Sequence, residues 1–138
     1  MKDPEKTLGN IIDHQSVAVI GSVDGDGFPR TKAMFAPRKR TGIKEFYFTT
    51  NTSSQRVAQY RKNPKATVYF QTRRFGFHGL EFIGTMEILE DAEIKKEIWR
   101  DGDDKYYDGV TDPDYCILKF TAVKCRYYSN LKKIDLDL

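Results

Sequence analysis

The segment between Tyr47 and Pro64 holds the side chains most able to bind a charged ligand. An apolar run ends there, small hydroxyl and amide residues follow, and a basic helix then begins. A helix N-terminus attracts anions because its backbone N–H groups are unpaired and carry the positive end of the helix dipole. Arg56 stands in the first turn, where a guanidinium can add a bidentate contact to a phosphate. The segment therefore predicts a phosphate site formed by Thr49, Thr50, Ser54 and Arg56.

A purely structural role explains part of the same pattern. Serine and threonine are the usual residues at a helix N-cap, and an arginine in a helix is usually solvated. The cluster of hydroxyl side chains is denser than a cap requires. Both interpretations, a helix cap and a phosphate site, stay open from local chemistry alone.

The composition describes an ordinary globular protein. Of the 138 residues, 39% are hydrophobic and 31% charged, so the chain can bury a core, and we expect one domain over residues 1–138. The formal charge of +3 permits an anionic ligand but is weaker than the usual footprint of a nucleic-acid-binding domain. The N-terminal MKDPEKTLGN has no apolar signal segment, and no apolar run approaches membrane-spanning length, so we expect a cytoplasmic protein.

The cysteines and histidines predict neither a disulfide nor a metal site. Cys116 and Cys125 lie nine residues apart, which places them on opposite faces of one regular strand, so we expect two buried free thiols. His14 and His78 have no cysteine or paired carboxylate at ligand spacing. We therefore expect no bound metal.

Apolar periodicity and turn residues predict a mainly β fold with short helices. Helices are expected at residues 3–14, 53–62 and 91–100, and strands at 16–23, 29–36, 44–50, 65–72, 80–90 and 116–128. Six strands in mostly hairpin order imply a small closed or nearly closed barrel. Gly84, inside its strand, indicates a bulge or a close approach of two backbones.

The run FYFTTNTSSQRVAQYRKNPKATVYF resembles the phosphate-binding segment of the pyridoxamine 5'-phosphate oxidase-like flavoproteins, whose fold is the six-stranded FMN-binding split β-barrel. In that family a strand ends in Thr and Asn, a Ser-basic-basic step binds the FMN phosphate, and Asn-Pro follows a helix later. Thr50-Asn51, Ser54-Gln55-Arg56 and Asn63-Pro64 stand at matching offsets. The departure is Gln55, where the oxidases carry a basic residue, so Arg56 alone supplies the side-chain charge.

The resemblance extends over most of the chain. GFPRTKAMF resembles the family's second strand, which passes along the flavin ring. LEFIGTMEILED, KKEIWR and YYDGVTDPDYCILKFTAVKCRYY resemble the branch that contains general stress protein 26. We therefore expect a single FMN-binding split-barrel domain.

The resemblance implies which residues contact FMN. The helix start would hold the phosphate, Arg30 and Lys32 would offer positive charge to the phosphate or to the pyrimidine edge of the flavin, and Met34 would contact the ring. An ordinary exposed strand face is the alternative explanation of Arg30 and Lys32. The full expected set is Arg30, Thr31, Lys32, Ala33, Met34, Phe48, Thr49, Thr50, Asn51, Ser54, Gln55, Arg56 and Tyr128.

The resemblance also implies a homodimer with FMN in the groove between the subunits. Tyr128 occupies the position of an aromatic residue that touches the cofactor across that groove. An exposed tyrosine at the end of a strand is the competing explanation.

The similarity to the vitamin B6 oxidases themselves fails at their substrate elements. Those enzymes extend further with an Arg-x-His element that holds the substrate phosphate, whereas this chain ends in LKKIDLDL. They also carry a glutamine just before the fifth strand's glycine, where Gly79 and Leu80 stand here. We expect no vitamin B6 oxidase activity.

Three functions remain open. The first is a flavin-dependent oxidoreductase or electron-transfer protein that accepts electrons from a nicotinamide or another donor, with no assigned catalytic residue. The second is a binding module that holds FMN or another phosphorylated ligand without turnover. For either function, a deazaflavin in place of FMN, or no cofactor, is an open alternative. The third is a barrel that binds single-stranded nucleic acid through Pro37–Arg40 and Thr72–Phe77, against which the weak net charge argues.

Overall fold

The computed structural model describes the whole chain, residues 1–138, and contains one antiparallel sheet. The strands are β1 (Val17–Val23), β2 (Pro29–Phe35), β3 (Lys39–Thr41), β4 (Glu45–Asn51), β5 (Lys65–Thr72), β6 (His78–Leu89), β7 (Tyr115–Ser129) and β8 (Lys132–Asp137). Neighbouring strands follow the order β2-β1-β5-β6-β7-β4-β3, and β8 pairs with β7. The mainly β architecture and the six longer strands confirm the prediction from the sequence.

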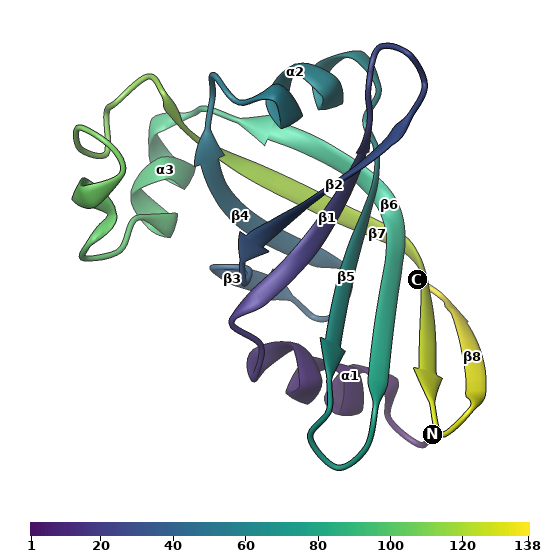
Figure 1. The fold of residues 1–138 in the computed structure, drawn as a ribbon. Helices are drawn as coiled ribbons and strands as arrows, with labels where there is room; N and C mark the ends of the chain where they lie inside the picture. The colour runs from purple at the N-terminus through teal and green to yellow at the C-terminus, as the bar shows by residue number, and fades with distance from the viewer.

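The sheet curls into a barrel (Figure 1), and its core contains a cluster of phenylalanine rings. Phe46 is fully buried and packs against Phe70, Phe82 and Phe120 at centroid distances of 5.6, 5.0 and 6.0 Å. Because the strand order begins at β2 and ends at β3, no ladder of hydrogen bonds joins the two ends of the sheet. We call the line between β2 and the β3–β4 hairpin the seam.

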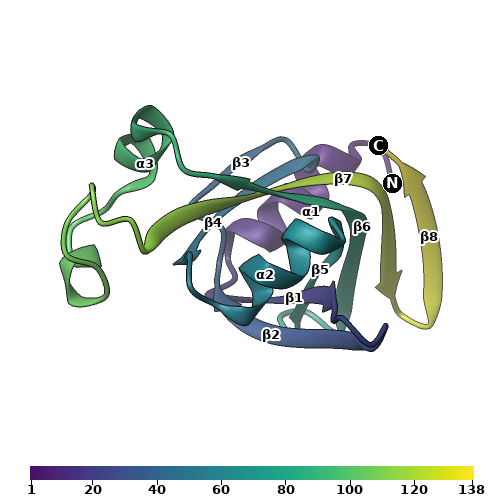
Figure 2. The same cartoon turned by 90° about the horizontal axis from the view of Figure 1, so that it is seen from above.

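Two helices cover the ends of the barrel. In Figure 2 the strands are seen around α2 (Gln55–Lys62), and Figure 1 places α1 (Pro4–Asp13) at the opposite end. Both helices contribute to the phenylalanine core, α1 through Leu8 and Ile12 and α2 through Val57 and Tyr60. The third helix, α3 (Ala92–Ile98), and the short 3-10 helix η1 (Asp103–Lys105) lie outside the barrel. None of these helices has the length and apolar character needed to cross a membrane.

Capping side chains determine where the helices begin. Asp3, Ser54 and Asp91 each accept a hydrogen bond from the backbone N–H three residues later, at 3.1, 3.3 and 3.4 Å. α2 ends at Lys62 because Asn63 precedes Pro64, and proline cannot continue the helix. The helices therefore lie where the sequence predicts them, with boundaries shifted by one or two residues.

Two short strands, β3 and β8, were not predicted, so the sheet has eight strands and not six. The three residues of β3 fall inside the predicted turn after β2 and pair with β4. β8 follows a tight turn at Asn130 and Leu131, whose φ angles are +52° and +63°. Leucine rarely adopts such a backbone, so this turn has no recognisable sequence signal.

A bulge in β7 changes which residues face the core. Ile83 pairs with Lys124 whereas Gly84 pairs with Ala122, so Val123 is an extra residue that has no partner in β6. Cys116 and Cys125 therefore both point into the phenylalanine core, and their predicted placement on opposite faces is wrong. Both are free and buried as expected, and burial raises the pKa of Cys125 to about 12.

The bulge requires a glycine at position 84. A Cβ atom there would collide with the backbone carbonyl oxygen of Thr121 and with Cα of Ala122. Gly84→Ala is expected to lower the free energy of unfolding by about 1–3 kcal/mol, the usual cost of overpacking. Urea denaturation measures the loss.

Gly25→Ala is the matched control for this substitution. No atom lies within 4 Å of a Cβ at Gly25, and its φ angle is not positive. The change is expected to alter stability by less than about 0.5 kcal/mol. Equal effects of the two substitutions would show that close backbone contact does not select glycine at position 84.

Candidate functional site

A cavity of about 390 Å³ lies at the seam, and we call it the seam pocket. β2 contributes three consecutive residues at its end, β4 contributes three at its end, and α2 contributes Arg56. The remaining lining comes from the start of β1 and from two loops. The complete lining is Val17, Ala33, Met34, Phe35, Arg38, Thr49, Thr50, Asn51, Arg56, Tyr106 and Tyr107.

Arg56 carries an unsatisfied donor. Its Nε atom is buried and has no hydrogen-bond partner in the protein, and Arg56 takes part in none of the ion pairs. Leaving a buried charged donor unpaired costs free energy, so such groups normally have a partner. Arg56 also lines the seam pocket, so an anionic group of a ligand there could pair with its guanidinium.

The hydroxyl-rich segment before α2 is partly structural. Ser54 is the N-cap of the helix, which confirms the cap interpretation for that residue. Asp114, just before β7, accepts hydrogen bonds from the Asn51 side chain at 2.9 Å and from the Ser53 backbone N–H at 2.8 Å. The Thr52 hydroxyl donates to the carbonyl of Pro113 at 3.0 Å. Thr49 and Thr50 are therefore the hydroxyl residues of this segment that line the pocket.

The opposite wall of the pocket is aromatic and was not predicted from the sequence. Tyr106 and Tyr107 lie in the loop between α3 and β7, and the Tyr106 ring is 6.3 Å from the ring of Phe35. Tyr107 is buried, which raises the pKa of its phenol, so it stays neutral at physiological pH. The one feature of the sequence that could have indicated this wall is the pair of adjacent tyrosines in a loop rich in Gly and Asp.

Several residues of the expected set lie outside the seam pocket. Arg30 and Lys32 are exposed on β2, and Arg30 pairs with Asp24 at 3.4 Å. Phe48 is buried in the core. The others outside the pocket are Thr31, Ser54, Gln55 and Tyr128, of which Tyr128 packs its ring 6.1 Å from Phe77.

The expected residues that the structure does bring together come from two distant segments. Ala33 and Met34 lie near the end of β2, whereas Thr49, Thr50 and Asn51 end β4 and Arg56 stands in the first turn of α2. The register confirms that Arg30, Lys32 and Met34 share one face of β2, since they pair with Ser22, Ile20 and Ala18. Only Met34 of these three lies at the pocket.

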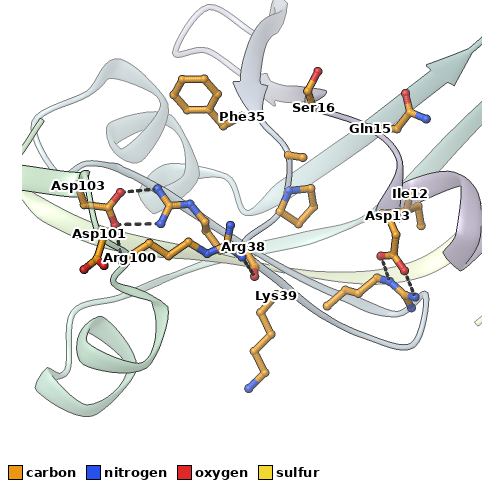
Figure 3. A pocket seen from close by; sticks show the side chains of 13 residues that line it. Ile12, Asp13, Gln15, Ser16, Phe35, Arg38, Lys39, Arg100, Asp101 and Asp103 are labelled. Atoms are coloured by element: carbon orange, nitrogen blue, oxygen red, sulfur yellow. Dashed lines mark hydrogen bonds and ion pairs between the residues drawn. The ribbon is translucent and has the colours of Figure 1, made fainter. Parts of the chain in front are cut away.

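A larger cavity of about 670 Å³ adjoins the seam pocket and shares Phe35 and Arg38 with it (Figure 3). We call it the outer cavity. Arg38 forms a bidentate pair with Asp103, with Nη2–Oδ1 and Nη1–Oδ2 distances of 2.7 and 2.9 Å. These hydrogen bonds hold the pKa of Asp103 below its usual value.

The basic run at residues 37–40 is neutralised within the protein. Besides the Arg38–Asp103 pair, Lys39 binds Glu97 at 2.7 Å, and Arg40 binds Asp13 through two contacts of 2.7 and 2.8 Å. A nucleic acid would have to displace these carboxylates. The geometry therefore does not favour the run as a phosphate-backbone contact.

Comparisons with known proteins find relatives over nearly the whole chain. A family described as pyridoxamine 5'-phosphate oxidase matches residues 5–129. General stress protein 26 of Bacillus subtilis strain 168 is 23% identical over 139 residues, covering 99% of this chain and 96% of its own. A Clostridium acetobutylicum protein related to general stress protein 26 is 36% identical, with a TM-score of 0.88 over 98% of this chain and 94% of that chain.

The same fold also occurs in a more distant protein. A heme binding protein from Mycobacterium smegmatis has a TM-score of 0.78, covers 98% of this chain with 58% of its own, and is 10% identical. At that identity the likeness extends to the fold alone.

The split barrel and its match over residues 5–129 define a class of protein: the chain belongs to the pyridoxamine 5'-phosphate oxidase family. Within that family it is similar to general stress protein 26 over nearly its whole length. Both findings confirm the resemblance seen in the sequence.

Proposed function

We propose that this protein is an FMN-binding flavoprotein of the cytoplasm that takes part in electron transfer or oxidoreduction. The observation that carries the proposal is Arg56, which forms no ion pair within the protein and lines a pocket that combines polar residues of β4 with apolar residues of β2. A flavin mononucleotide has two matching parts, a doubly charged phosphate and a planar ring. Family membership supports the same cofactor.

The residues of the seam pocket fit the two ends of FMN. Arg56, Thr49 and Thr50 offer a guanidinium and two hydroxyl groups, which suits a phosphate. Ala33 and Met34, at the end of β2, offer apolar contact to a ring. Arg30, Lys32 and Gln55 lie away from the pocket, so we assign the phosphate charge to Arg56 alone.

FMN, when bound, supplies one- and two-electron chemistry, and the protein supplies binding, orientation and electrostatics. The polar residues of the seam pocket are neutral hydroxyl, amide and phenol groups or permanently charged arginines. None of them is a general acid or base poised near neutral pH. The chain therefore positions the ring and excludes water, and we assign it no catalytic proton transfer.

Loss of the Arg56 guanidinium should remove the phosphate contact. Arg56→Ala is expected to weaken FMN binding by about 1.5–3 kcal/mol, or roughly 10- to 150-fold, the range for a charge-assisted hydrogen bond. Wild-type protein should prefer FMN to riboflavin, and the variant should lose that preference. Fluorescence titration with both flavins measures the two affinities.

Arg61→Ala is the matched control, because Arg61 lies on the same helix but pairs with Glu90 and is absent from the pocket. Its flavin affinity should equal that of the wild type. An Arg56→Ala variant that still prefers FMN to riboflavin would place the phosphate elsewhere.

Electron transfer is distinguished from passive binding by reduction of the loaded protein. We expect FMN-loaded protein to be bleached under anaerobic conditions by NADH or NADPH and to recover its colour with an electron acceptor. The visible absorption spectrum reports both steps. Bleaching by dithionite but by neither nicotinamide would favour the alternative, a stress protein that binds FMN without accepting nicotinamide electrons.

We further propose a homodimer in which the seam pocket opens into the subunit groove. Val17 and Phe35 pair across β1 and β2, are 49% and 67% exposed, and both line the pocket. Ile83 on β6 and Val123 on β7 are also exposed, at 43% and 52%. An apolar face of this kind usually marks an interface.

The dimer is tested by placing a charge on that face. The wild type is expected to have about twice the 16.0 kDa mass of one chain, and Val123→Glu should produce monomers because a buried unpaired carboxylate is costly. Val123→Thr, which adds no charge, should remain dimeric. Light scattering measures the mass, and a monomeric wild type would contradict the proposal.

A further inference from the structure

The loop at residues 99–114, between α3 and β7, projects from the barrel (Figures 1 and 2). It carries Tyr106 and Tyr107, which line the seam pocket. Tyr106 is 60% exposed and meets Phe35, itself 67% exposed, at the pocket. Two large exposed aromatic side chains beside a pocket provide an apolar wall for a planar ring.

One ion pair fastens this loop to the connection between β2 and β3. The Arg38 and Asp103 side chains are only 13% and 5% exposed, and both oxygens of the carboxylate accept from the guanidinium (Figure 3). Asp103 also accepts from the backbone N–H of Arg100 at 2.9 Å. In return, the Arg100 side chain donates to the carbonyl of Arg38 at 2.7 Å.

Three of these contacts meet on Asp103, the first residue of η1, which stands three positions before Tyr106. The backbone N–H of Tyr106 in turn donates to the carbonyl of Asp103 at 2.9 Å. The position of Asp103 therefore fixes the position of Tyr106. Arg38 itself follows Phe35 by three residues, so the pair links both sides of the aromatic wall.

We infer that Arg38 and Asp103 are positioning residues that hold Tyr106 against the ring of the bound flavin. The inference rests on the proposed function, because it concerns the same pocket. It assigns the ring end of the ligand to Phe35 and Tyr106, and it leaves the phosphate end to Arg56. The two ends should then respond differently to substitution.

A second ion pair in the chain provides a matched control. Arg40 and Asp13 form an equally bidentate contact, at 2.7 and 2.8 Å. Both residues line the outer cavity, and Asp13 lies on the side away from Asp103 (Figure 3). This pair ties α1 to β3, and neither residue lines the seam pocket. Removing it changes charge pairing without touching the loop.

The experiment compares Asp103→Asn, Tyr106→Ala and Asp13→Asn in titrations with FMN and with riboflavin. Asp103→Asn and Tyr106→Ala should each lower the affinity for both flavins by about fivefold, because each loses one aromatic contact with the ring. The preference for FMN over riboflavin should stay unchanged in both, in contrast to Arg56→Ala. Asp13→Asn should bind both flavins as the wild type does.

The double variant Asp103→Asn/Tyr106→Ala tests whether the ion pair acts through the tyrosine. Its affinity should equal that of Tyr106→Ala alone, because the contact that Asp103 positions is already gone. If the fold losses of flavin affinity in the two single variants multiply in the double variant, the inference is overturned. If Asp103→Asn fails to fold, Arg38→Lys, which keeps the charge but loses the bidentate geometry, replaces it in the cycle.

Trp99, the only tryptophan, reports on the loop without any ligand. Its ring lies 6.3 Å from Tyr107 and 5.2 Å from Tyr115, so its emission and its quenching by acrylamide depend on loop packing. Both should change in Asp103→Asn and stay constant in Asp13→Asn. An unchanged Trp99 signal, with normal flavin binding by Asp103→Asn, overturns the inference and leaves the proposed function intact. A wild type that binds neither flavin overturns the proposed function itself.

Discussion

The open seam between β2 and the β3–β4 hairpin is the constraint on which the site depends. A closed barrel pairs every strand edge and fills its interior with side chains. Here the hydrogen-bonded order stops at β2 on one side and β3 on the other. The seam pocket and the outer cavity, which have Phe35 and Arg38 in common, both lie at this seam. The seam pocket therefore exists because the barrel is not fully closed. Every element that lines it reaches the seam from a different part of the chain.

The arginines near the seam differ in function because their surroundings differ. Arg38 and Arg40 face carboxylates and are satisfied by bidentate contacts, so they fasten a loop and a helix to the sheet. Arg56 lines the seam pocket together with threonines and apolar residues, and it pairs with no carboxylate. In an interior of low polarity a guanidinium requires a partner. The geometry supplies that partner for the first two residues and leaves the third for a ligand.

Local signals predicted most of the fold and about half of the site. The six longer strands and the three helices follow from periodicity, caps and Asn63-Pro64, which act over a few residues. Thr49, Thr50 and Arg56 were found because they are close together in the chain. Arg38, Tyr106 and Tyr107 were missed because contacts across about 65 residues bring them to the pocket, and no local pattern encodes those contacts. Arg30 and Lys32 have suitable charge, but they lie further along β2 than the pocket reaches.

The extra residue in β7 has an evolutionary consequence. Alternate side chains face the core on both sides of Val123, with Phe120 and Ala122 before it and Cys125 and Tyr127 after it. Deleting the extra residue would therefore leave Cys125 and Tyr127 facing inward, and it would only restore regular pairing with β6. Homologous chains should accept many side chains at this position, and a chain one codon shorter there should be released from the need for glycine opposite the bulge, because Thr121 and Ala122 would no longer be pressed against position 84.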